Sequence, residues 1–588
     1  MTPTPTNNHD LPLRRADFSS VPEAIDYAAK GASGLNFYSA RLELTASLPY
    51  ALLRERAVQL ARGMVQAGLD KGARIVLLGD TDPEIITAFF ACQYASLIPV
   101  IAPIPASLGG REAYVASLKR LLLNCRAAAA IAPSDYLGFI NEAVADLGEV
   151  PMVGTPRAFF DLPGNAVDPR PFGPGDPCYL QYSSGSTREP LGVDVPQHCL
   201  MANTHGIATV GLDVQPDDRG ISWLPLYHDM GLVGFLLTPA FCQRSVDFLA
   251  TRDFARRPLS WLKLFGDNGG TLAYSPTFGY DLCSRRAEKG TSEQLDLSSW
   301  RAAGIGGDMI RPEVMAHFAE VFAPHGFRRT AFVASYGMAE ATLAVSFAPL
   351  QQGLDVDVID RRQLADNQRA EPAADDSKIG DRRGFVDCGP PLPGHVVEIR
   401  GEDGSQLPDR RVGRVFVKGP SIAIGYFEAP EATAEHFRDG WLDTGDLGYL
   451  VDGRLMITGR SNDLMIINGR NIWPQDIEWA IEMLAGIRQG DVAVFSIEDA
   501  DSEPRVIILV QCRLRDQDER GQLRREVKAT ATRAAAVDGM VVLVPAHSLP
   551  MTASGKLSRT AARRKYLSGT FDDHGISNDA PLPAAASR

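Results

Sequence analysis

The stretch YLQYSSGST, residues 179–187, joins an apolar strand pattern to a run of small hydroxyl residues. Residues 179–182 predict a buried strand. The run that follows consists of Ser183, Ser184, Gly185, Ser186 and Thr187. Small residues around a glycine leave backbone N–H groups free to wrap a phosphate, and the hydroxyls add donors without bulk. Most Ser/Gly runs are ordinary turns, so a phosphate-binding loop is one of two readings of this stretch.

Outward from this stretch, short apolar runs alternate with helical patterns. Runs of the same kind predict buried strands at 75–79, 127–132 and 330–334. Amphipathic spacing predicts helices at 54–67 and 311–322. Alternation of strands with helices is typical of an α/β fold with mostly parallel sheets.

The longest uncharged stretch, residues 85–110, is apolar but broken by Pro99, Pro103 and Pro105. A spanning helix needs about 20 consecutive, mostly apolar residues, so this stretch predicts a buried helix followed by a buried strand instead. The first residues, MTPTPTNNHD, lack the basic and apolar regions of a signal peptide. We therefore expect a cytoplasmic protein without a transmembrane segment.

A smaller α+β domain is predicted near the carboxyl end. Pro474 suits the first turn of a helix, and Ile477, Ile481 and Leu484 recur at helical spacing. Strands at 491–497, 505–512 and 540–544 and a helix at 518–537 complete this pattern.

The expected organisation has four parts. Residues 1–16 and 568–588 are polar or poor in large apolar residues and predict disordered tails. Residues 17–460 form a large domain and residues 461–567 the small one. Within the large domain, residues 350–383 are polar and charged, which on composition alone predicts a solvated loop.

Composition excludes several classes of function. A chain of 588 residues exceeds a single hydrophobic core. Its net charge of −13 argues against nucleic-acid binding, because no excess of cations meets the phosphates. Eight scattered cysteines without a C-x-x-C pair indicate neither a zinc site nor a disulfide framework.

Four further motifs place suitable chemistry downstream of the Ser/Gly run. They are ASYGMAE (334–340), GWLDTGD (440–446), GRSND (459–463) and PMTASGK (550–556). The aromatic ring of the first can stack on a purine, and its carboxylate can bind a hard cation. The last carboxylate of the second can accept both hydroxyls of a ribose. Alone, each has an ordinary alternative, namely a helix cap, a turn or a solvated lysine.

As an ordered set, these motifs resemble the adenylate-forming superfamily of acyl-CoA synthetases, nonribosomal peptide synthetase adenylation domains and luciferases. The resemblance covers about residues 17–567. It is closest to the fatty acyl-AMP ligases, through LQY (180–182), SGSTR (184–188), WLPLYHDMG (223–231) and the polar insertion 350–383. In those ligases a comparable insertion hinders the domain rotation needed to use coenzyme A, and the acyl-adenylate passes to a carrier protein.

The resemblance implies a nucleotide site. It implies that residues 183–187 cradle the β- and γ-phosphates of ATP. The remaining nucleotide-binding residues that it implies are Gly307 and Asp308 beside adenine, Tyr336 with Gly337 stacking on it, and Asp446 with Arg460 on the ribose.

The resemblance also implies the catalytic groups. Glu340 would bind Mg²⁺ with Thr187 nearby, and Lys556 would bridge the substrate carboxylate and the α-phosphate. Asn462 falls at the hinge of the family. His228 gates or shapes the acyl pocket, or is a structural histidine.

Three positions depart from the family pattern. Arg188 replaces the usual glycine, Leu191 replaces a frequent lysine, and Ser335 stands where relatives often read the adenine amino group. The expected function is activation of a fatty acid with ATP, followed by transfer to an acyl carrier protein or to a carrier domain of a polyketide or nonribosomal peptide synthase. The alternatives are a long- or medium-chain acyl-CoA ligase and a catalytically silent adenylate-binding protein.

Overall fold

The computed structural model describes residues 4–6, 11–105, 110–148, 151–162, 168–182, 191–290, 294–467, 470–497, 504–535, 537–552 and 556–571. The chain forms two compact units. The first consists of Met1–Val358 and Gly384–Thr458, and the second of Ile359–Arg383 and Gly459–Arg588. The chain therefore passes between the units at three places rather than one.

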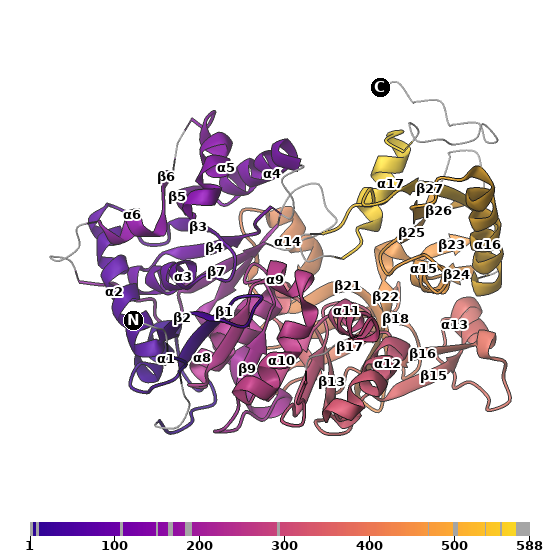
Figure 1. The fold of residues 1–588 in the computed structure, drawn as a ribbon, viewed down its shortest axis with the longest axis horizontal. Coiled ribbons are helices and arrows are strands. Elements are labelled where there is room, and N and C mark those ends of the chain that lie inside the picture. The colour runs from indigo at the N-terminus through magenta and orange to yellow at the C-terminus, as the bar shows by residue number, and fades with distance from the viewer. Residues whose placement is uncertain are drawn as a thin grey trace. The chain divides into compact units, whose positions relative to one another are not determined.

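The first sheet of the large unit is parallel and has helices on both faces. Its order is β4 (Ile98–Ala102), β3 (Arg74–Leu78), β5 (Ala127–Ile131) and β6 (Met152–Gly154). Figure 1 shows α3 (Pro83–Ala95) beside α2 (Tyr50–Gln66). Apolar residues of α4 (Arg111–Asn124) and α5 (Ser134–Val144) pack on the other face.

Within the uncharged stretch 85–110, residues 85–95 belong to a buried helix and residues 98–102 form a buried strand, as predicted. The Asp82 carboxylate caps α3 by accepting from the backbone N–H groups of Glu84 and Ile85. The helix ends at Ser96, which has a left-handed backbone conformation, and β4 follows directly. No helix in the described part of the chain is long and apolar enough to cross a membrane.

The second sheet of the large unit has eight strands. Its order is β14 (Ala344–Phe347), β13 (Phe332–Gly337), β12 (Ala302–Ile305), β11 (Leu272–Ser275), β9 (Gly220–Ser222), β10 (Val246–Leu249), β1 (Gly34–Tyr38) and β2 (Leu44–Pro49). The inner strands pair in parallel, and the two edge strands are antiparallel.

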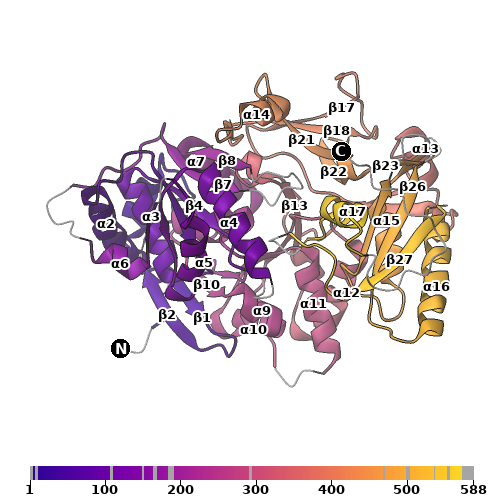
Figure 2. The ribbon, with the colours of Figure 1, turned by 90° about the horizontal axis from the view of Figure 1, so that it is seen from above.

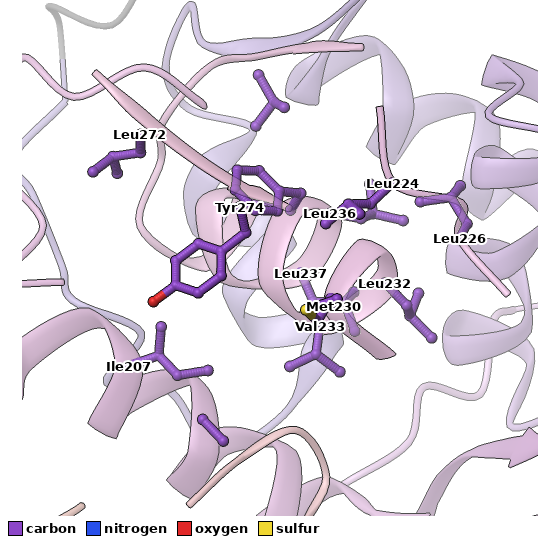
Figure 3. Packing of buried hydrophobic residues seen from close by; sticks show 14 of the residues in the cluster. Ile207, Leu224, Leu226, Met230, Leu232, Val233, Leu236, Leu237, Leu272 and Tyr274 are labelled. Atoms are coloured by element: carbon purple, nitrogen blue, oxygen red, sulfur yellow. The ribbon is translucent and has the colours of Figure 1, made fainter. Parts of the chain in front are cut away.

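Helices α10 (Pro258–Asn268), α11 (Thr277–Glu288) and α12 (Pro312–Phe322) contribute an aromatic core around Trp261 and Trp300. Figure 3 shows the apolar side chains of the π-helix η3 (Met230–Leu237) buried near Tyr274 of β11.

Two further sheets complete the large unit. A five-stranded antiparallel sheet contains β17 (Val396–Arg400), β18 (Gly413–Lys418), β20 (Phe437–Arg438), β21 (Trp441–Val451) and β22 (Arg454–Arg460). A three-stranded sheet has the order β19 (Gly425–Tyr426), β8 (Gly192–Pro196) and β7 (Pro177–Tyr182).

The second unit is an α+β layer built on three strands. Its sheet has the order β25 (Val492–Ile497), β26 (Arg505–Cys512) and β27 (Gly539–Pro545). Helices α15 (Pro474–Glu482) and α16 (Gln517–Ala535) pack on one face, and α17 (Arg559–Leu567) packs on the other (Figure 2). A short hairpin, β23 (Met465–Ile467) and β24 (Arg470–Ile472), precedes α15.

The polar insertion differs from the expectation that residues 350–383 belong to the large domain. β15 (Val356–Asp360) and β16 (Arg382–Val386) pair at its ends, and α13 (Arg361–Asn367) lies between them. Residues 359–383 belong to the small unit. Arg361 and Arg383 both form ion pairs with Asp476 in the first turn of α15, at 3.2 and 2.9 Å. The polar composition predicted a solvated segment. It gave no information about the unit against which the segment packs.

The amino-terminal segment 1–16, predicted to be a disordered tail, makes specific contacts at its described residues. Thr6 is buried, and its backbone N–H donates to Asn36 Oδ1 at 3.0 Å. Its carbonyl accepts from Arg219 Nη1 at 3.1 Å, and Arg219 forms a buried pair with Asp247. A polar sequence can thus be ordered when a buried polar network receives it.

At the other end, Phe571 is also buried, against the α17 face of the small sheet. The expected tail 568–588 therefore begins with packed residues. Residues 572–588 lie outside the described part of the chain.

Replacing Arg219 with Met should lower the free energy of unfolding of the large unit by about 3–5 kcal/mol, because Asp247 would remain buried and unpaired. Urea unfolding followed by tryptophan fluorescence measures the change. The control Arg54→Met breaks an exposed pair with Asp26 and should cost about 0–1 kcal/mol. Equal, small losses in both variants would contradict the assigned role of the buried pair.

Candidate active site

The pairing of the parallel strands β12 and β13 brings two predicted motifs together. Ile305, the last residue of β12, pairs with Ala334, so the turn Gly306–Asp308 leaves β12 next to Ser335 in the second half of β13. A Cβ on Gly306 would lie 3.0 Å from the Ser335 carbonyl oxygen, and Gly307 has a φ of +77°. Crevices at the carboxyl ends of parallel strands are the usual ligand sites of such sheets.

The predicted adenine and ribose residues meet at this edge. Tyr336 donates its hydroxyl to Asp446 Oδ2 at 2.7 Å, and both side chains are largely buried. Asp446 belongs to β21, far from Tyr336 in sequence, and its backbone N–H donates to Thr444 Oγ1 at 3.1 Å. The bond fixes the aromatic ring and the carboxylate relative to each other.

Glu340 lies on a tight turn between β13 and β14. The 3₁₀ turn Ala339–Ala341 carries it, and the hydroxyl of Tyr426 in β19 donates to Glu340 Oε1 at 2.9 Å. The Glu340 carbonyl accepts from the Ala423 N–H at 2.9 Å. Sequence reasoning missed Tyr426. The signal that could have found it is a hydroxyl-bearing aromatic residue in the short apolar run IAIGYF, residues 422–427.

These residues fit a nucleotide with its cation. Gly306 and Gly307 put no side chain over the edge where Tyr336 and Asp446 meet. Among the described residues, no group of three or more His, Cys, Asp or Glu side chains could hold a metal. A single oriented carboxylate such as Glu340 suits Mg²⁺, which is usually bound by one or two carboxylates, water and substrate phosphates.

His228 lies just before the π-helix η3. Its Nδ1 is 2.6 Å from Asp229 Oδ1, and the same carboxylate accepts from the Met230 N–H at 2.8 Å. The neighbouring Tyr227 is partly buried, and this desolvation raises its pKa to about 12, so its phenol stays neutral. The carbonyl of Tyr227 accepts from Gln181 of β7 at 2.8 Å. His228 is therefore held by its own loop.

Lys556 belongs to the second unit and pairs with Thr552, on the other side of residues 553–555, which lie outside the described part of the chain. Its carbonyl accepts from the Thr552 N–H at 2.7 Å, and its N–H donates to Thr552 Oγ1 at 3.1 Å. Three residues later, Arg559 pairs with Glu478 and with Asp463, each at 2.6 Å. This ties the start of α17 to the 3₁₀ turn Ser461–Asp463.

The remaining predicted residues are only partly placed. The phosphate-loop residues 183–187 lie outside the described part of the chain, directly after β7. Gly337 ends β13, and Asp308 is exposed with its carboxylate accepting from the Met309 N–H. Arg460 ends β22 within the second unit, whereas Asp446 belongs to the first. Asn462 is exposed on the turn that Arg559 ties down.

A family model described as AMP-binding enzyme matches residues 35–427, more than half of the chain. The chain belongs to the AMP-binding enzyme family. It is therefore an adenylate-forming ligase, and enzymes of this kind use ATP.

Two proteins show high coverage in comparison with this AMP-binding enzyme. A protein of Caulobacter vibrioides named "Putative acyl-CoA synthetase" is 50% identical over 97% of this chain and 99% of its own. The medium-chain-fatty-acid–[acyl-carrier-protein] ligase JamA of Moorena producens is 31% identical over 96% of this chain and 95% of its own.

A solved structure from a study of fatty acyl-adenylate ligases of E. coli and L. pneumophila is 43% identical. It superposes with a TM-score of 0.90 and covers 94% of this chain and 99% of its own. The α/β fold with its large parallel sheet is thus the adenylate-forming fold, as predicted.

In this AMP-binding enzyme, Tyr336→Phe should raise the KM for ATP about tenfold, because Asp446 loses the hydroxyl that orients it. Initial rates of pyrophosphate release at varied ATP measure the change. The matched control is Tyr449→Phe. Tyr449 lies on β21, the strand of Asp446, and its hydroxyl donates to Asp357 Oδ2 at 2.7 Å. The KM of this variant should stay near that of the wild type, and equal rises in both variants would reject the assigned role of Tyr336.

Proposed function

We propose that this enzyme converts a fatty acid and ATP into an acyl-adenylate and pyrophosphate, with Mg²⁺, and then passes the acyl group to a carrier protein. The observation that carries the proposal is the meeting of Tyr336 and Asp446 beside Gly306–Asp308. An aromatic ring and a ribose-binding carboxylate at a carboxyl strand edge fit a nucleoside.

The chemistry brings two anions together, so the protein must supply positive charge and alignment. Asp446 would hold the ribose hydroxyls, with Arg460 beside them, and Tyr336 the adenine. Backbone N–H groups of residues 183–187 would hold the β- and γ-phosphates. These contacts would leave the α-phosphorus as the atom open to attack.

Lys556 would draw the substrate carboxylate onto the α-phosphorus as a compact point charge. Glu340, oriented by Tyr426, would hold Mg²⁺ with Thr187. When bound, Mg²⁺ neutralises phosphate charge and favours departure of pyrophosphate. His228, held against Asp229, would shape the acyl entrance.

The similar proteins support different acceptors. The structural neighbour at 43% identity supports an acyl-adenylate product, and JamA supports delivery of the acyl group to an acyl carrier protein. The name of the Caulobacter protein favours coenzyme A as acceptor. Residues 359–383 favour the first reading, because they bind the small unit while both of their ends continue into the large one.

Pyrophosphate release with a medium- or long-chain fatty acid should reach its full rate without coenzyme A. Adding coenzyme A should yield little acyl-CoA, and adding a carrier protein should yield acylated carrier.

Lys556→Ala should lower the rate of pyrophosphate release by a factor of about 10²–10³, a size typical for loss of one preorganised charge contact. The control Lys565→Ala alters a lysine that donates to the Ser548 carbonyl and should retain activity. Rapid acyl-CoA formation by the wild type would replace the proposal with an acyl-CoA ligase.

The ion pairs of Asp476 with Arg361 and Arg383 should restrict rotation of the small unit about Asn462. A unit joined at one point can turn freely, but this one is joined at three. Rotation must therefore carry the insertion along or detach it. A bias of a few kcal/mol would keep a thioester-forming arrangement at about 1% or less.

Asp476→Ala should accordingly raise acyl-CoA yield at a matched rate of acyl-AMP formation, and deletion of about residues 355–380 should raise it further. The control Arg362→Ala breaks a pair with Asp381 inside the same segment and should leave the yield unchanged. Unchanged yields in both Asp476→Ala and the deletion would show that the insertion does not limit the use of coenzyme A.

A further inference from the structure

The backbone directly after Glu340 is strained. Thr342 has φ +70° and ψ −55°, and the Leu343 N–H donates to the Ala341 carbonyl at 2.9 Å. These values define a γ-turn of the rare, strained kind. A β-branched residue with positive φ is a genuine outlier, and such outliers persist only where surrounding structure enforces them.

The γ-turn sets where Glu340 lies. It reverses the chain so that the Met338 N–H can donate to the Leu343 carbonyl at 2.7 Å, and β14 begins at Ala344. Gly337 permits this close return, because a Cβ there would lie 1.8 Å from the Leu343 oxygen. Relaxation of Thr342 would therefore displace Glu340 from its place between the two strands.

A buried network enforces the turn. Thr342 Oγ1 donates to the Ser421 carbonyl at 2.7 Å. Asn203 Nδ2 donates to Ser421 Oγ at 3.0 Å and to the Ala344 carbonyl at 2.8 Å. The side chains of Thr342, Ser421 and Asn203 are fully buried.

His395 completes the network. Its Nδ1 lies 3.2 Å from the Pro393 carbonyl oxygen, which can only accept, so Nδ1 carries the proton and Nε2 accepts. Nε2 lies 2.6 Å from Ser421 Oγ, which therefore donates to it. Burial lowers the pKa of His395, which favours this neutral form. Gly419 lies against the ring, since a Cβ there would come within 2.3 Å of it.

The same short segment also contacts Glu340 itself. The Ala423 N–H donates to the Glu340 carbonyl, and the Tyr426 hydroxyl donates to Glu340 Oε1, both at 2.9 Å. Residues 421–426 thus hold the turn, the backbone and the carboxylate of Glu340 at once.

We propose that Thr342, Ser421, Asn203 and His395 are positioning residues for Glu340, which hold the strained turn and so aim its carboxylate at the divalent cation. The proposal rests on the proposed function, in which Glu340 binds Mg²⁺. A network that served only the stability of the β13–β14 connection would change melting temperature but not cation affinity. The two roles therefore differ in a measurable quantity.

The central variant is Thr342→Val, which keeps the branched shape and removes the hydroxyl donor. The Mg²⁺ concentration for half-maximal pyrophosphate release should rise about three- to tenfold, the range expected for one lost buried hydrogen bond. Thr342→Ser keeps the donor and should restore the wild-type value. The control Thr87→Val removes a 2.7 Å bond from an equally buried hydroxyl to the Pro83 carbonyl and should leave Mg²⁺ dependence unchanged.

A second readout needs no turnover. Melting temperature is titrated with Mg²⁺ at fixed ATP and without fatty acid, and the midpoint should shift in Thr342→Val as it does in the kinetics. Ser421→Ala offers an independent variant if Thr342→Val fails to fold, and it should shift the midpoint in the same direction.

Glu340→Gln separates failure of this proposal from failure of the proposed function. Glu340→Gln should change the Mg²⁺ concentration for half-maximal pyrophosphate release. If it does so while both Thr342→Val and Ser421→Ala leave that concentration unchanged, the positioning role is rejected and the metal assignment stands. If Glu340→Gln itself leaves Mg²⁺ dependence unchanged, the metal assignment is rejected and the positioning role with it.

Discussion

The parallel register of β12 and β13 is the constraint on which the site depends. Because Ile305 pairs with Ala334, the connection after β12 leaves the sheet beside the last three residues of β13, and the two connections that leave these strands share a narrow edge. The first connection meets this constraint with two glycines. The second meets it with a reversed turn, in which Gly337 lets the chain return close to itself. A one-residue change of register would move Tyr336 to the opposite face of the sheet and away from Asp446.

Burial then decides what the polar groups at this edge can do. Tyr336 and Asp446 are largely removed from water, where an unpaired carboxylate or phenol is costly. Their mutual bond lowers that cost and preserves one geometry. The same principle governs Glu340 with Tyr426 and Arg559 with Glu478. In each case a charged side chain is oriented by a side chain from a distant segment of the chain.

The sequence predicted the layered α/β fold, the small α+β unit and several elements almost to the residue, such as β26 at Arg505–Cys512. It did so because apolar periodicity and turn residues are local signals. The roles predicted for Tyr336, Glu340 and Asp446 came from the ordered set of motifs, since each residue alone has an ordinary alternative. The sequence could not show that Thr342 is strained or that Ser421 and Asn203 hold it, because those contacts join segments far apart in the chain. The order of Thr6 and the unit bound by residues 359–383 escaped prediction for the same reason.

The three crossings between the units also have a consequence during synthesis. Residues 359–383 leave the ribosome well before Asp476 and the rest of the small unit. At typical rates of about 5–20 residues per second, Arg361 and Arg383 wait for several seconds without their carboxylate partner. The small unit therefore cannot be completed as an independent carboxyl-terminal module. A chimera that exchanges only residues 459–588 would inherit a partner surface shaped for a helix that its new host does not encode.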